Sequence, residues 1–360
     1  MLRLMLMLAA LVAPPPPSAQ VHVVSPRPFE VWDGHLRGHV PAGTPAVTVR
    51  AGRRSWQVPV AADGSFDRLL TRVPLGDQRL TVDGRRVGPV FGLPSGSLRP
   101  LPSPRPDRRL SREYAGAAAR ATPYVSAYTR GPDGTAGAYN AGAEFEAAST
   151  LKLPIMLVAL SKNHGELADS SYWDPMVRVT SYSDNDAANE LLEQTGGSDE
   201  GGAAEMVELM RSLNLNHTFM AGGYLTGGGG SPLFGVVDPP PSAYKHTTAG
   251  DMGTLAAMVV AAAAGRGPLV RHGVDRHEAR ELLYLMLHAK DAGLVRAGAH
   301  GLPVAHKIGW LTDADNDVAV VFSYRGPVVI AIYTNGIEDG TAQLYALDVV
   351  KTALQSGILR

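Results

Sequence analysis

The sequence predicts an α+β domain preceded by a small all-β module, and three observations support this prediction. Residues 21–93 contain short runs of alternating apolar and polar residues between turn sequences, with no sustained helical period. Residues 94–108 are rich in Pro, Ser and Arg, which is typical of a linker. Residues 109–360 then follow the order helix, two strands, several helices, three strands and helix, which is typical of α+β layering.

The strands of the leading module are expected at residues 21–24, 46–49, 55–58 and 79–82. Each run is rich in β-branched or aromatic residues, which favour strands. Turn sequences such as Asp63-Gly64 and Asp83-Gly84 separate them. A small immunoglobulin-like β-sandwich is the natural interpretation. We expect this module to fold alone and to be dispensable for the chemistry of the rest of the chain.

Residues 109–360 contain stretches with the helical period of apolar residues and stretches with the alternation typical of strands. Helices are expected at residues 110–121, 151–160, 187–192, 248–264, 278–287 and 344–354. Strands are expected at residues 124–128, 136–141, 304–308, 318–324 and 328–334.

Composition excludes several classes of site. The 360-residue chain contains no cysteine, so disulfides, thiol catalysis and zinc-thiolate sites are excluded. The histidines lack metal-ligand spacing, so neither a metal nor a cofactor is predicted. Residues 21–108 carry 13 Arg against 7 acidic residues, and residues 109–360 carry 19 basic against 27 acidic residues. The basic module could contact an anionic cell-wall polymer, or its arginines are simply solvated surface, and no nucleic-acid partner is predicted.

The N-terminus resembles a secretory signal. Arg3 is its only charged residue, and residues 4–12 form an apolar core that is shorter than the ~20 residues an ordinary membrane span needs. Cleavage is expected near Ala19, which predicts a secreted, extracytoplasmic protein. An uncleaved membrane anchor is the alternative.

Three short motifs carry the chemical prediction: Ser149-Thr150-Leu151-Lys152, Ser183-Asp184-Asn185 and Lys307-Ile308-Gly309. The chain has only six lysines, and two of them fall in these motifs. The first motif opens an apolar run, so Ser149 can sit at a helix N-terminus with Lys152 one turn on. A second copy, Ser242-Ala243-Tyr244-Lys245, follows a proline run and is expected to lie in a loop. Taken singly, the motifs could be helix caps and an edge-strand lysine.

In this order the motifs resemble those of the penicillin-binding protein and serine β-lactamase superfamily, and of class A β-lactamases in particular. The resemblance covers residues 109–360. It implies a five-stranded antiparallel sheet with flanking helices and a helical subdomain. It also implies that Asp184 braces its loop, and that backbone N–H groups of Ser149 and Trp310 hold the oxyanion.

The residue types fit an acyl-transfer reaction. A serine nucleophile needs a base within hydrogen-bond reach, and a neutral Lys152 beside a second ammonium could supply it. Ser183 can relay a proton, and Asn185 can hold a substrate amide. Lys307 and His306 are expected to line a strand edge and attract a substrate carboxylate. Gly309 is expected to leave room for substrate against that strand.

The sequence departs from class A β-lactamases in three ways. Ser149 and Ser183 are only 34 residues apart, roughly half the usual interval. Ile308 stands where the third motif of these enzymes has a Thr or a Ser. No glutamate lies between Glu208 and Glu278, where these enzymes carry their deacylating glutamate, and Asp238 is the one carboxylate before the helix that starts near Thr247.

The sequence therefore predicts a serine hydrolase that forms an acyl-enzyme at Ser149 with β-lactams or D-alanyl cell-wall peptides. Deacylation is expected to be slow, with Asp238 as a weak candidate for its base. Two alternatives stay open: a peptidoglycan D,D-peptidase that uses Lys152 as its base, and a non-catalytic penicillin- or wall-binding protein.

Overall fold

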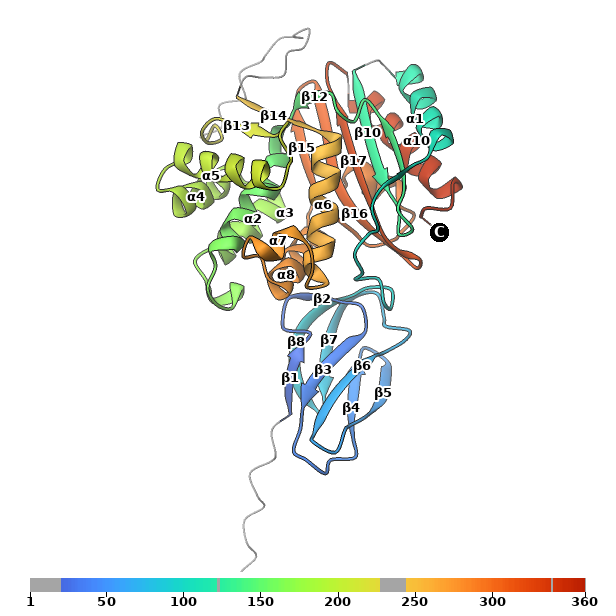
Figure 1. Cartoon of the computed structure of the whole chain (residues 1–360), viewed down its shortest axis with the longest axis vertical. Coiled ribbons are helices and arrows are strands. Elements are labelled where there is room, and N and C mark those ends of the chain that lie inside the picture. The colour runs from blue at the N-terminus through green and yellow to red at the C-terminus, as the bar shows by residue number, and fades with distance from the viewer. Residues whose placement is uncertain (1–20, 122–123, 227–243, 338, 360) are drawn as a thin grey trace, which may run out of the picture.

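The structure is a computed structural model, and it describes residues 21–121, 124–226, 244–337 and 339–359. A small all-β module lies at one end of a larger α+β part (Figure 1). The α+β prediction and the leading all-β region are confirmed. In the described residues, no helix is both long and apolar enough to cross a bilayer.

Two sheets form the leading module. One has the strand order β1 (His22–Ser25), β3 (His35–His39), β6 (Ser65–Leu69). The other has the order β2 (Glu30–Trp32), β8 (Arg85–Gly92), β7 (Gly76–Val82), β4 (Ala46–Ala51), β5 (Arg54–Pro59). Alternate residues of β4 and β7 are buried with Trp32 and Leu36 in one apolar core, because successive strand residues point to opposite faces.

The larger part is built on a six-stranded sheet. Its order is β15 (Val304–Leu311), β16 (Ala314–Ser323), β17 (Gly326–Thr334), β10 (Val125–Arg130), β11 (Thr135–Tyr139), β9 (Arg105–Pro106). The first five strands are antiparallel, as expected. The two-residue strand β9 adds a parallel edge and comes from the segment that was expected to be a linker.

Helices cover both faces of this sheet (Figure 1). One face packs against α1 (Arg108–Ala121), α9 (Leu294–Gly298) and α10 (Asp339–Gln355). The other face packs against the helical part of the chain. That part comprises α2 (Lys152–Lys162), α3 (Trp173–Tyr182), α4 (Asn185–Gly196), α5 (Asp199–Ser212), α6 (Ala249–Ala263), α7 (Pro268–Arg271) and α8 (Arg276–Leu287).

Two 3-10 turns and a small sheet complete the described elements. The 3-10 turns are η1 (Ala148–Leu151) and η2 (Leu167–Asp169). The sheet has the order β12 (Glu144–Glu146), β14 (Lys245–Thr248), β13 (Phe219–Met220). It lies beside the residues that lead into η1, since Ala147 N donates to Lys245 O.

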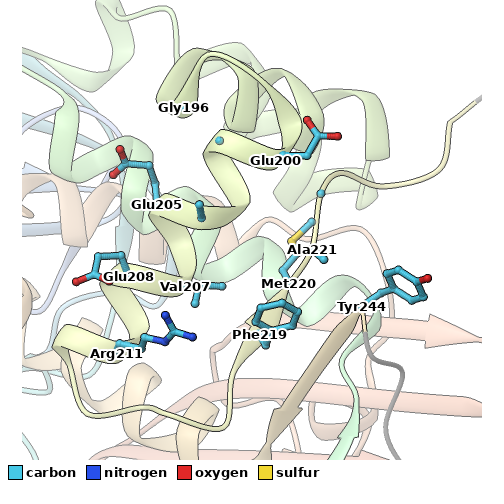
Figure 2. Close-up of a pocket in the computed structure, with 13 residues that line it drawn as sticks. Gly196, Glu200, Glu205, Val207, Glu208, Arg211, Phe219, Met220, Ala221 and Tyr244 are labelled. Carbon is cyan, nitrogen blue, oxygen red and sulfur yellow. The ribbon is translucent and has the colours of Figure 1, made fainter.

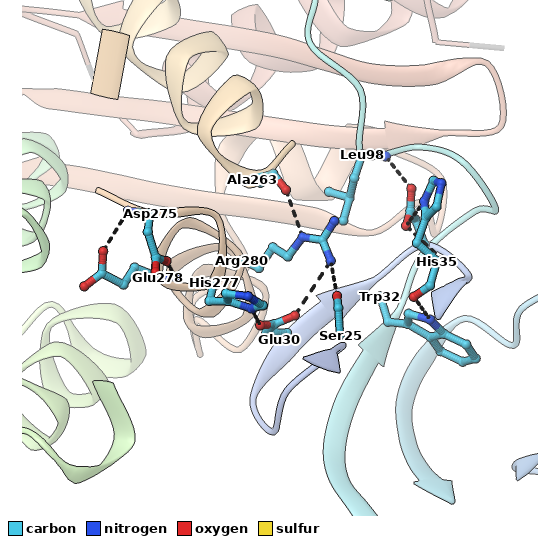
Figure 3. Close-up of polar contacts among 11 residues, drawn as sticks. Ser25, Glu30, Trp32, His35, Leu98, Ala263, Asp275, His277, Glu278 and Arg280 are labelled. Atoms are coloured by element: carbon cyan, nitrogen blue, oxygen red, sulfur yellow. Dashed lines mark hydrogen bonds and ion pairs between the residues drawn. The ribbon is translucent and has the colours of Figure 1, made fainter. Parts of the chain in front are cut away.

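The leading module packs directly against α8 and α3. The Phe29 ring lies 4.9 Å from the ring of Trp173 and 5.9 Å from that of Tyr284, centroid to centroid. Figure 3 shows the polar part of this interface, where the fully buried Glu30 meets His277 and Arg280. The interface is therefore partly apolar and partly ionic, and the leading module makes specific contacts with α3 and α8.

Candidate active site

Ser149 lies in a tight turn that is fixed from two sides. It belongs to η1, which runs directly into α2. Ala148 before it has φ of 48°, a left-handed conformation that costs an alanine of order 1–3 kcal/mol. Gly309 of β15 packs against this turn, since a Cβ there would lie 2.9 Å from Ser149 N and from Ala147 O. The absence of a side chain at Gly309 therefore lets β15 pack closely against the turn that carries Ser149, in addition to leaving the expected room for substrate.

Lys152 is buried at the first residue of α2 and points at the Ser149 hydroxyl. Its Nζ lies 3.0 Å from Ser149 Oγ. It also donates to the Ser183 carbonyl oxygen and to Asn185 Oδ1, the latter at 2.6 Å. Among the described residues, no carboxylate bonds to this nitrogen.

Burial lowers the pKa of Lys152 to about 6, and the nearby Lys307 ammonium acts in the same direction. At neutral pH the amine is therefore mostly unprotonated. A neutral amine 3.0 Å from a serine oxygen can accept the hydroxyl proton.

Ser183 bridges the two lysines. It lies at the C-terminal end of α3 in a left-handed conformation, with φ of 55°. Its Oγ accepts from Lys307 Nζ at 2.8 Å and lies 3.3 Å from Lys152 Nζ. A proton can therefore pass between the two lysine side chains through one hydroxyl.

Asp184 and Asn185 begin α4. The Asp184 side chain accepts from Ala187 N and pairs with Arg178 at 2.8 Å. It thus caps the helix and is held by Arg178. Asn185 Oδ1 accepts from Lys152, while its Nδ2 donates to Leu225 O at 2.8 Å. The second hydrogen of this amide takes no part in these bonds and can serve a substrate carbonyl.

Lys307 lies on β15, an edge strand of the main sheet, and only 2% of its surface is exposed. Burial lowers its pKa to about 8, against the opposing effect of Asp291 and Asp317. Trp310 is three residues further along the same strand, and its side chain is exposed. The strand therefore brings a buried cation to Ser183, beside the turn that carries Ser149.

The prediction that His306 lines the substrate edge is wrong. Its side chain is fully buried, with Nδ1 3.1 Å from Asp317 Oδ1 and Nε2 3.2 Å from Asp291 Oδ1. Neighbouring residues of a strand point to opposite faces, so placing Lys307 toward Ser149 turns His306 away from it. His306 instead ties β15 to Asp317 of β16 through Nδ1, and Asp291 of the loop before α9 lies beside its Nε2.

Two residues beside the site were not among the sequence predictions. The Tyr224 ring lies 4.5 Å from Lys152 Nζ, and Lys245 Nζ lies 4.7 Å from the same ring, measured to its centroid. Lys245 belongs to the second Ser-x-x-Lys copy, but it opens strand β14 and reaches the site. Ser242 of that copy and Asp238 lie outside the described residues. The scarcity of lysine was the available hint, because three of the six lysines converge here.

A separate hollow of about 840 Å³ opens between α5 and β13 (Figure 2). Its lining includes Glu200, Glu205, Glu208 and Arg211 of α5 and Phe219 of β13. It contains none of the predicted catalytic side chains. Among the described residues, no group of three or more His, Asp and Glu side chains is arranged to hold a metal ion.

The family described as "Beta-lactamase enzyme family" matches residues 168–355, which is more than half of the chain. The match includes the second and third motifs and begins after the first. No functionally curated protein matched the sequence.

Solved structures share the fold at low sequence identity. A β-lactamase from Sphaerobacter thermophilus DSM 20745 is 21% identical, with a TM-score of 0.51, over 69% of this chain and 96% of that protein. PBP-A is 20% identical, with a TM-score of 0.55, over 71% of this chain and 98% of PBP-A. A mutant of PBP-A has been solved as an acyl-enzyme complex with penicillin G and is 20% identical, with a TM-score of 0.55, over 71% of this chain and 99% of that one.

Proposed function

Because the chain belongs to the beta-lactamase enzyme family, we propose that it is a serine hydrolase that forms an acyl-enzyme at Ser149. The substrates would be β-lactams or D-alanyl peptides of the cell wall. The 3.0 Å approach of a mostly neutral Lys152 to Ser149 Oγ is the observation that carries this proposal.

The first chemical step follows from these positions. Lys152 Nζ takes the Ser149 hydroxyl proton as Oγ attacks the carbonyl carbon of the substrate. The carbon–nitrogen bond then breaks, and the leaving nitrogen receives a proton from Ser183 Oγ. Lys152, now protonated, returns a proton to Ser183, so the step ends with both groups as they began.

Backbone N–H groups and Lys307 would stabilise the charges of this step. The Ser149 N–H, next to the Gly309 strand, and the Trp310 N–H would hold the oxyanion, and one such donor is worth about 3 kcal/mol. Lys307 would attract the substrate carboxylate, and Asn185 Nδ2 would bind its amide. Ile308 supplies no hydroxyl for the carboxylate, so Lys307 carries more of this recognition.

The proposal includes slow deacylation. Hydrolysis of the ester needs a base that activates water, which is typically worth ~10²–10⁴-fold in rate. None of the described carboxylates bonds to Ser149 or Lys152. The predicted secretion signal in residues 1–19 would bring the enzyme to cell-wall substrates.

Intact-mass spectrometry after mixing with penicillin G tests the proposal. We expect a mass increase of one penicilloyl group per chain, on the peptide containing Ser149, and its loss in Ser149→Ala. Labelling that survives in Ser149→Ala would contradict the assignment. A chromogenic cephalosporin should give a burst near one equivalent and then a slow rate. Rapid burst-free turnover would instead indicate an efficient β-lactamase.

Cleavage of D-alanyl peptides would favour the D,D-peptidase alternative. An acyl-enzyme that forms once without turnover of either substrate class would favour a penicillin-binding protein without hydrolytic function. The absence of any adduct would leave a non-catalytic wall-binding protein.

A further inference from the structure

Tyr224 is held in one position beside the nucleophile. Its backbone N–H donates to Asn189 Oδ1 at 2.7 Å, and its carbonyl oxygen accepts from Asn189 Nδ2 at 2.8 Å. Gly223 before it lies so close to α5 that a Cβ would be 2.1 Å from Asp199 Oδ2. The Asn189 amide of α4 and this tight contact with α5 therefore fix the backbone that presents the Tyr224 ring.

The side chain of Tyr224 contacts two parts of the catalytic arrangement. Its hydroxyl donates to the Ala148 carbonyl oxygen at 3.2 Å, on the residue with the left-handed conformation. Its ring lies 4.5 Å from Lys152 Nζ, measured to the ring centroid. One side chain thus supports the nucleophile turn and covers the base.

The Tyr224 ring is one of several neighbours of Lys152 Nζ. Oxygen atoms of Ser149, Ser183 and Asn185 lie within hydrogen-bond distance of the same nitrogen. A water molecule that Lys152 could activate needs a place within about 3 Å of Nζ. Because the Tyr224 ring lies 4.5 Å from Nζ, it fills space that such a water molecule would need.

Tyr224 is not itself a base for hydrolysis. Its hydroxyl hydrogen is engaged with Ala148 O. Burial raises the pKa of the phenol above its ordinary value of 10, so the group stays protonated at neutral pH. Its effect on the reaction must come through position and the exclusion of water.

We propose that Tyr224 is a positioning residue that holds the Ser149 turn through its hydroxyl and prolongs the acyl-enzyme by keeping water away from Lys152 with its ring. The kinetic half of this inference rests on the proposed function. The effect on the surroundings of Lys152 does not, and it can be measured without any substrate.

Two variants of the full-length protein separate the roles of hydroxyl and ring. Tyr224→Phe keeps the ring, so deacylation of the penicillin G adduct should stay within about twofold of wild type. Its acylation should slow by about three- to tenfold, the loss expected for one ordinary hydrogen bond. Tyr224→Ala opens the space, and its deacylation should accelerate at least about tenfold, within the range of general-base catalysis. Tyr324→Phe, on an exposed tyrosine, is the matched control and should change neither rate.

The substrate-independent measurement is the titration of Lys152 by NMR of ¹³Cε-labelled lysine. The chain has only six lysines, so Lys152→Arg assigns the resonance. In wild type and Tyr224→Phe the pKa should be about 6, because burial dominates it. In Tyr224→Ala, water reaches the amine and the pKa should move up toward the ordinary 10.5.

The outcomes are distinct. An unshifted Lys152 titration in Tyr224→Ala overturns the inference, whether or not penicillin reacts. Wild-type deacylation in Tyr224→Ala with acylation retained also overturns it. Failure of the wild-type chain to acylate removes the proposed function alone. If Tyr224→Ala does not fold, Tyr224→Leu, which still vacates part of the ring volume, should shift the same two measurements in the same directions, and no shift there overturns the inference.

Discussion

The Ser183 hydroxyl accepts from the Lys307 ammonium at 2.8 Å, and the same oxygen atom lies 3.3 Å from Lys152 Nζ. The second and third motifs are therefore joined at one oxygen atom, and the first motif meets them there. Burial lowers the pKa of both lysines, so each can release or take a proton near neutral pH. The three motifs form one continuous path for a proton.

The first prediction removes that oxygen. Ser183→Ala should lower the rate of acylation by penicillin G by about 10²–10⁴-fold, since proton delivery to the leaving nitrogen is lost. Stopped-flow kinetics measures this rate. The fold should persist, because alanine adopts the left-handed conformation of this position about as readily as serine. Ser181→Ala, two residues earlier on α3, is the control and should acylate normally. A rate within about tenfold of wild type in Ser183→Ala would show that the proton takes another route.

The sequence predicted the parts of the site that depend on local geometry. Ser149 and Lys152 are one helical turn apart, so their approach follows from spacing. Periodicity predicted α1, α2, α4, α6, α8 and α10 but not α3, α5, α7 and α9. The five-stranded antiparallel sheet was implied by the family resemblance, and the structure has it. Ser183 and Lys307 lie 124 positions apart, so only the resemblance to a family brought them together.

The errors also have physical causes. His306 was expected to line the substrate edge together with Lys307, but strand alternation places neighbouring side chains on opposite faces. Tyr224 was missed because it lies in an irregular segment, where no period indicates which way a side chain points. Its role depends on contacts with Ala148, Lys152 and Asn189, which are distant in sequence.

The second prediction concerns the pH dependence of acylation. Lys152 must be neutral to act as base, so the rate should rise as pH rises through about 6, the pKa of its amine. Lys307 must be charged to attract a substrate carboxylate, so the rate should fall as pH rises through about 8, the pKa of that ammonium. Acylation by penicillin G, followed from about pH 4 to about pH 10, should be bell-shaped. A substrate ester without the carboxylate should lose the alkaline fall. A rate that is highest in acid would exclude Lys152 as the base.

The third prediction is a pH dependence of stability that arises at the interface with the leading module. Glu281 of α8 is 3% exposed, and burial raises its pKa to about 8, with Glu30, Glu166 and Glu278 acting in the same direction. The folded protein therefore binds a proton that the unfolded chain releases above its ordinary pKa of 4.5. The contribution of Glu281 to stability must fall as pH rises from about 4.5 to about 8 and then level off.

Glu281→Gln removes this titration. The variant should gain stability relative to wild type as pH rises through that window, by an amount on the order of a few kcal/mol at most. Urea unfolding at a series of pH values measures the difference. Glu208→Gln, on an exposed part of α5, is the control and should follow the wild-type pH profile. Parallel profiles for wild type and Glu281→Gln would show that Glu281 ionises normally in the folded protein.

The last prediction is that the leading module contributes to the stability of the protein but not to the rate of acylation. The module contributes none of the three motifs, so a chain of residues 94–360, which keeps β9, should acylate within a few-fold of the full chain per folded molecule. Its stability should be lower, because Trp173 and Tyr284 lose the Phe29 ring. Arg280, only 4% exposed, also loses Glu30 as a partner, and breaking a buried ion pair typically costs about 3–5 kcal/mol.

Thermal unfolding and the burst amplitude with penicillin G report on the two effects separately. Within the full chain, Phe29→Ala should lower the unfolding temperature and leave the acylation rate unchanged. Leu69→Ala, on an exposed apolar residue of the same module, should change neither. If residues 94–360 unfold at the temperature of the full chain, the contacts of Phe29 and Glu30 do not stabilise α3 and α8. If they fold stably but acylate far more slowly, the module acts on the site through α8, whose residues pack in the same apolar core as Leu153 of α2.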